Sequence, residues 1–122
     1  MKNTLNDLEA KMSYFVINSE VKAVQGMDEL SIRKNLVLWD DKFQLIEYHD
    51  KKGSISERHN HLNEDMLCYL ISGKVKETVD NETRIVTGGD CWYVPAGVEH
   101  EAYTLEDSAI ICIFNPPAKE RM

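Results

Sequence analysis

The sequence predicts an all-β domain from Tyr14 onward. Apolar residues in this part of the chain come in short runs that are separated by turn-forming residues. No helical periodicity of useful length follows before the C-terminus. A chain of 122 residues is long enough for one hydrophobic core and too short for two, so a single domain is expected.

The N-terminal segment, residues 1–30, has a different pattern. Between Thr4 and Phe15, the apolar residues Leu5, Leu8 and Met12 recur at helical spacing, and Thr4 can cap the first turn. We predict a short amphipathic helix there that packs on the barrel or on a partner. The alternative interpretation is a frayed tail.

The body of the domain, residues 31–115, divides into short strands. Asp40-Asp41, Asp80-Asn81 and Gly88-Gly89-Asp90 supply turn residues between them, and Pro116-Pro117 ends the last strand because proline has no N–H to donate. Residues 116–122 are expected to form a C-terminal tail. The predicted strands cover residues 31–39, 43–49, 54–61, 66–72, 74–79, 83–87, 91–94, 100–104 and 109–114.

Charge and cysteine content exclude several classes of partner. The formal net charge of -7 repels phosphate backbones and anionic membrane surfaces, so neither nucleic acid nor a membrane is an expected partner. Cys68, Cys91 and Cys112 are odd in number and lie in apolar runs, which favours reduced, mostly buried thiols. With no apolar N-terminal signal region and no run as long as a membrane span, a cytoplasmic location is expected.

Three histidines form the candidate metal site. His59 and His61 are two residues apart on a predicted strand, so both side chains project from the same face. His100 follows a Pro95-Ala-Gly97 turn and opens another strand. Three imidazoles that converge suit a divalent transition metal such as Zn, Fe, Ni, Mn or Cu.

These residues resemble the two motifs of the cupin family. Gly53, His59, His61 and Gly73 match the first motif, and Gly89, Pro95, Gly97 and His100 match the second. The resemblance implies a double-stranded β-helix, or jelly roll, in which the histidines bind a metal inside a pocket that accepts a small molecule. It also implies a homodimer that pairs through sheet edges and N-terminal segments.

The fourth metal ligand departs from the family pattern. The position of the family's carboxylate ligand holds Met66, a soft and weak donor, while the neighbouring Asp65 fits a shorter spacing from His61. Strand alternation would point Asp65 and Met66 to opposite faces. Either residue is a candidate for the position beside the three histidines.

The C-terminal part resembles a subfamily of small pectin-degradation cupins that tautomerise unsaturated uronates. That subfamily has an aspartate, a phenylalanine, an arginine and a glutamine at positions held here by Cys112, Phe114, Ala118 and Met66. Cys68, Cys112 and Phe114 are predicted to form the pocket wall. The proton-transfer carboxylate and the arginine are therefore missing from their usual places.

Three functions are compatible with these residues. The first is a metal-binding cupin that acts on a small organic molecule, by sugar-acid or keto-enol isomerisation. The second is a three-histidine iron dioxygenase, because the acidic ligand is missing. The third is a non-catalytic ligand-binding or sensing module that has lost its acid-base groups. No catalytic residue is assigned from the sequence.

Overall fold

The computed structural model describes residues 14–39 and 42–118, and these residues form an all-β fold. The only helical element among them is a 3₁₀ turn, η2 (Asn18–Glu20). The predicted N-terminal helix lies outside the described residues except for Tyr14 and Phe15, which are exposed and not helical.

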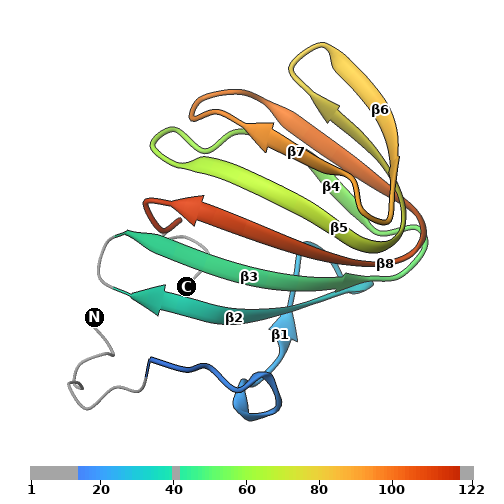
Figure 1. Cartoon of the computed structure of the whole chain (residues 1–122). Helices are drawn as coiled ribbons and strands as arrows, with labels where there is room; N and C mark the ends of the chain where they lie inside the picture. Colours follow the sequence, from blue (N-terminus) through green and yellow to red (C-terminus); the bar gives the residue numbers. More distant parts are fainter. Residues whose placement is uncertain (1–13, 40–41, 119–122) are drawn as a thin grey trace.

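Antiparallel strands build the barrel (Figure 1). β3 and β5 both pair with β8, β2 pairs with β3, and β6 and β7 pair with different halves of β5. The strands are β1 (Val24–Gln25), β2 (Ser31–Trp39), β3 (Phe43–Asp50), β4 (Ile55–His59), β5 (Asp65–Val79), β6 (Glu82–Thr87), β7 (Cys91–Val94) and β8 (His100–Asn115).

β5 and β8 belong to both layers of the jelly roll. The first half of β8 pairs with β4 and with the second half of β5, whereas its second half pairs with β3 and with the first half of β5. Each long strand therefore passes from one layer into the other, and Figure 1 shows the resulting curvature. The space between the layers holds the core and the candidate site.

The predicted breaks at Gly73 and after Thr104 are wrong. The structure has one bent strand, β5, in place of 66–72 and 74–79, and one bent strand, β8, in place of 100–104 and 109–114. Gly73 has a φ of +106°, and a Cβ there would lie 2.5 Å from the Asp107 carbonyl oxygen. The backbones of β5 and β8 are in close contact at Gly73. The pairing between the two strands therefore continues past this residue with register shifts instead of ending.

Inward-facing side chains alternate along the strands as predicted. Met66, Cys68 and Leu70 of β5 are buried, and so are Ile110, Cys112 and Phe114 of β8. The C-terminal segment continues this packing as far as the structure describes it, because Ala118 is buried and its N–H donates to Gln44 Oε1 at 2.9 Å.

The cysteines follow the prediction only in part. The three cysteines are not joined by disulfides, and Cys68 and Cys112 are buried, but Cys91 is exposed on the outer face of β7. Its position is set by strand alternation, which turns the neighbouring Trp92 toward the interior instead. Among the described residues, no helix is long and apolar enough to span a membrane.

Candidate metal centre

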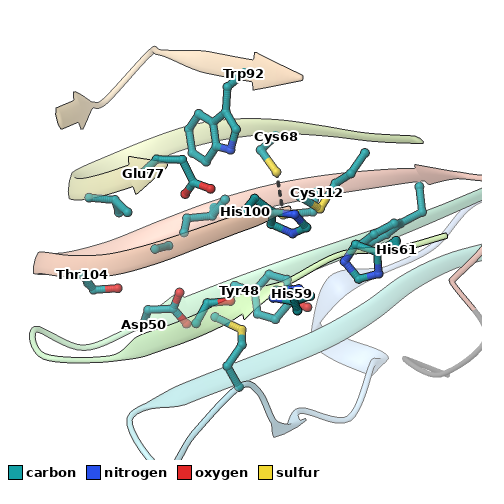
Figure 2. A pocket seen from close by; sticks show the side chains of 17 residues that line it. Tyr48, Asp50, His59, His61, Cys68, Glu77, Trp92, His100, Thr104 and Cys112 are labelled. Carbon is teal, nitrogen blue, oxygen red and sulfur yellow. Dashed lines mark hydrogen bonds between the residues drawn. The ribbon is translucent and has the colours of Figure 1, made fainter. Parts of the chain in front are cut away.

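His59, His61 and His100 lie together inside the barrel (Figure 2). One ligand atom from each residue can be chosen so that all three lie within 4.8 Å of one another. The ring centroids are 4.9 Å apart for His59 and His61, 4.3 Å for His59 and His100, and 5.2 Å for His61 and His100. The three side chains could therefore share one metal ion.

Strand pairing brings two of these histidines together. His59 ends β4 and lies directly opposite His100, which begins β8. A register shift between Ser56 and His59 changes the alternation of β4, so that both of these residues line the cavity although they are three positions apart, while Ile55 is 48% exposed. This irregularity re-aims the end of β4, as β-bulges often do beside functional sites.

His61 lies just beyond the end of β4 and is placed by two contacts. The Gly97 N–H donates to its carbonyl oxygen at 2.8 Å, which joins the His61 loop to the turn that precedes His100. Its ring meets the Phe114 ring edge to face, with centroids 5.2 Å apart and an interplanar angle of 74°. The side chain is only 4% exposed, so packing restricts its orientation.

Backbone carbonyls select the ring nitrogens that can bind a metal. His59 Nδ1 lies 2.6 Å from the Glu57 carbonyl oxygen, and His100 Nδ1 lies 3.2 Å from that of Val98. A carbonyl can only accept, so Nδ1 carries the proton in both rings and Nε2 keeps its lone pair. Such carbonyl-supported imidazoles are typical of metal ligands, and the residues present fit a metal ion.

The two candidates for the fourth position point in opposite directions. Asp65 is exposed, and its carboxylate accepts the Ala96 N–H at 2.9 Å. Met66 is buried and lines the cavity beside the histidines. The structure thus places three imidazoles and a thioether at the cavity, while the Asp65 carboxylate holds the turn before His100.

The remaining predicted wall residues also line this cavity. Cys68 and Cys112 are opposite each other on β5 and β8, with their sulfur atoms 3.2 Å apart, and Phe114 is adjacent to His61. The cavity has a volume of about 60 Å³, enough for a metal ion with a few ligand atoms. The cavity wall is mostly apolar on the side of Cys68, Cys112 and Phe114.

Sequence reasoning did not identify two carboxyl groups that line the same cavity. Glu77 of β5 is 7% exposed, and Asp50 of β3 is also buried, with the Ser31 hydroxyl donating to it at 2.6 Å. Burial raises the pKa of Glu77 to about 8, against a smaller lowering by the Trp92 indole N–H. Burial likewise raises the pKa of Asp50 to about 6, and the Ser31 hydroxyl opposes this shift.

A signal for Glu77 was present but depended on register. Met66, Cys68 and Leu70 face inward, but the shifts around Gly73 change the alternation, so that Val75 and Glu77 face inward in the second half of β5. The strand predicted at 74–79 already places Glu77 on the face of Val75, so alternation from Val75 could have found it. His49, the other histidine of the described residues, is exposed and bonds Glu47 at 2.9 Å.

Comparison with known proteins agrees with this fold. The family model described as "Cupin domain" matches residues 46–114, more than half of the sequence, and the chain belongs to the cupin family. An uncharacterized protein of Streptomyces coelicolor is 38% identical over 55 residues, which are 44% of this chain and 52% of that protein. The match therefore spans about half the length of this relative.

Two solved structures are similar along most of their length. KdgF from Halomonas sp. has a TM-score of 0.81 and 25% identity, and the match covers 88% of this chain and 99% of KdgF. An RmlC-like cupin from Shewanella frigidimarina has a TM-score of 0.82 and 20% identity, with 91% and 97% covered. The second similarity concerns the fold alone.

Proposed function

We propose that this cupin binds a divalent transition metal through His59, His61 and His100 and acts on a small organic molecule, by sugar-acid or keto-enol isomerisation. The observation that carries the proposal is the convergence of three buried or half-buried imidazoles on one cavity, two of them with Nδ1 held by a backbone carbonyl. The resemblance of the C-terminal part to the small cupins that tautomerise unsaturated uronates supports the choice of reaction.

The protein's own residues would prepare this site in three ways. The carbonyls of Glu57 and Val98 orient two imidazoles with Nε2 toward the cavity. Phe114 and Met66 exclude water from the site, which strengthens electrostatic interactions inside it. When bound, the metal would act as a Lewis acid that polarises a carbonyl or enol oxygen of the substrate.

The cavity also limits the substrate. The enclosed volume of about 60 Å³ accepts the reacting end of a molecule beside a metal, and the pocket opens to solvent. We infer a ligand that either has only a few non-hydrogen atoms or inserts one end and leaves the rest outside.

The metal site is tested by metal analysis of protein purified without chelators and without an immobilised-metal column. We expect close to one transition-metal ion per chain, and loss of that ion in His100→Ala. Isomerisation is then tested by NMR with a 4,5-unsaturated uronate as substrate. Protein that binds no metal under these conditions would contradict the proposal.

A three-histidine iron dioxygenase is the second candidate, and one observation favours it. Met66 lies in the cavity where the family has its carboxylate ligand, while Asp65 bonds a backbone N–H outside the cavity. The ligand set would then be neutral. Stoichiometric iron together with substrate-dependent oxygen uptake would distinguish this activity from isomerisation.

A non-catalytic binding module is the third candidate. Cys112 and Ala118 are buried at the positions where the uronate-tautomerising cupins have an aspartate and an arginine. Tight binding of a small acid with no chemical change across the same substrate panel would favour this reading.

We further propose a homodimer, in which the outer face of β5 and β7 packs against the same face of a second copy. Leu67, Tyr69 and Ile71 of β5 are half-exposed there, and Tyr93 of β7 lies directly opposite Leu67. Together with Ile113 of β8, opposite Leu67 on the other side, they form a continuous apolar surface. Contiguous exposed apolar surface of this kind is typical of protein–protein interfaces.

Light scattering tests the dimer. We expect twice the chain mass for the native protein and a monomer for Tyr69→Lys, since a buried lysine at the centre of a symmetric interface would face its own copy. A monomer at all working concentrations would contradict this proposal and leave the metal site unaffected.

A further inference from the structure

Glu77 is the buried carboxyl group that shares the cavity with the histidine cluster. In the pairing of β5 with β8, Val79 lies opposite His100 and Glu77 lies opposite Ala102. His100 and Ala102 project from the same face of β8, about 7 Å apart along the strand. Glu77 is therefore one inward position away from the candidate metal site, on the adjacent strand.

The surroundings of Glu77 do not explain it as a structural residue. Buried carboxyl groups normally pair with a cation, and the salt bridges among the described residues do not include Glu77. Trp92 lies beside its carboxyl group, as Figure 2 shows. A buried carboxyl group that has a raised pKa and lines a cavity is characteristic of functional sites.

We propose that Glu77 is the acid-base residue of this site and takes the place of the carboxylate that Cys112 has replaced. This inference rests on the proposed isomerase function. It assigns the proton carrier to a different strand, β5 instead of β8, and to the side of the cavity where Asp50 and Thr104 also lie.

The raised pKa suits this role. With a pKa of about 8, Glu77 is mostly protonated at neutral pH and ionises readily, so it can both give and take a proton. Lysines, arginines and protonated histidines are not among the causes of this shift, and Glu101 is the charged group that contributes to it.

The ligand class follows from the two sides of the cavity. The histidine side suits an oxygen of a carbonyl or enol group, and the Glu77 side suits the carbon next to it. In ketonisation, Glu77 gives its proton to that carbon as the C=C electron pair forms the new C–H bond. The enol O–H bond breaks, its electron pair completes the C=O bond, and its proton passes to water and restores the Glu77 acid.

The substitution Glu77→Gln removes the acidic proton and keeps the shape of the side chain. Glu106→Gln is the matched control. Glu106 lies on β8, is exposed and pairs with Lys74 at 3.4 Å on the surface. Both variants are first examined for folding by circular dichroism and for metal content, which should match those of the native protein.

The first measurement is independent of activity. Infrared difference spectra at pH 7 should contain a protonated-carboxyl band in the native protein and in Glu106→Gln, and this band should be absent from Glu77→Gln. Identical spectra for the native protein and Glu77→Gln would overturn the assignment of a protonated Glu77.

The second measurement is solvent exchange of the carbon-bound protons of oxaloacetate and of a 4,5-unsaturated uronate, followed by NMR in D₂O. We expect Glu77→Gln to lower the exchange rate at least about 100-fold and Glu106→Gln to leave it unchanged. Glu77→Asp should recover part of the rate.

The outcomes separate the two proposals. Exchange by Glu77→Gln at the native rate overturns the role of Glu77 and leaves the proposed function intact. Metal-loaded native protein that exchanges neither probe overturns the acid-base role but not metal binding. Absence of bound metal overturns the proposed function itself.

Discussion

His59 and His100 face each other across the β4–β8 pair, at the point where one strand ends and the other begins. Their ring centroids are 4.3 Å apart, and each Nδ1 is held by a carbonyl oxygen two residues earlier in the chain. Because backbone contacts set both rings, the site is organised before any metal binds. Such preorganisation lowers the cost of binding.

Replacing His100 by alanine should weaken metal binding strongly. Two imidazoles are too few to hold a transition metal tightly against water, so we expect at least about 100-fold weaker affinity. Titration calorimetry with Zn²⁺ or Co²⁺ measures this effect. The matched control is His49→Ala, because His49 is exposed and pairs with Glu47 instead of facing the cavity. Equal affinities for the two variants would contradict the histidine site.

Metal removal should lower the thermal stability of the native protein. An ion that binds the folded state alone stabilises it by mass action, on the order of 3 to 4 kcal/mol at 100 to 1,000 times its dissociation constant. Thermal unfolding with and without a chelator measures the difference. The chelator should have no effect on His100→Ala, which has no ion to lose.

Glu77→Gln should change how the stability of metal-free protein depends on pH. Folding raises the pKa of Glu77 from 4.5 to about 8, so between these values the folded state binds a proton that the unfolded state has released. The contribution of Glu77 to stability is thus complete below pH 4.5 and is lost as the pH rises toward 8. Glutamine does not titrate.

The two proteins should have similar stability at pH 5. At pH 9, Glu77→Gln should be more stable by an amount on the order of a few kcal/mol. Urea unfolding of both proteins at both pH values measures their stabilities. Subtracting one stability from the other at each pH cancels the contributions of the other titrating groups. A pH-independent difference would show that Glu77 does not have a raised pKa.

Phe114→Ala should destabilise the fold and loosen the metal site together. Phe114 is fully buried at the end of β8 and packs edge to face against His61. Removing a buried phenylalanine ring costs about 3 to 5 kcal/mol, measured by urea unfolding. Phe114→Leu retains most of the volume, so it should cost less and keep more of the metal affinity.

Gly73→Ala and Gly89→Ala form a matched pair. Both glycines have positive φ, +106° for Gly73 and +97° for Gly89, so both substitutions introduce backbone strain of about 1 kcal/mol or more. A Cβ at Gly73 would in addition meet the Ser108 Cα at 2.6 Å, whereas no atom lies within 4 Å of a Cβ at Gly89.

We therefore expect Gly73→Ala to be destabilised by several kcal/mol more than Gly89→Ala, because backbone contacts cannot move aside as a side chain can. Thermal unfolding of the two variants measures the difference. Equal losses would mean that β5 and β8 are not in close contact at this point.

Much of the fold was predictable because its signals are local. β2 and β7 begin and end at the predicted residues, since turn-forming residues flank them and alternation can be read along a few positions. Met66, Cys68 and Leu70 face inward for the same reason. The bends in β5 and β8 were not predictable, because the ladder continues through them by pairing with residues roughly 30 to 40 positions away.

The sequence by itself determined the class of fold, the three histidines and the loss of the usual carboxylate at Cys112, because residue identity and motif spacing are properties of the chain alone. Only the tertiary structure decided that Asp65 lies outside the cavity and Glu77 inside it. The face on which a strand residue lies depends on bulges and register, and strand pairing between distant segments decides both.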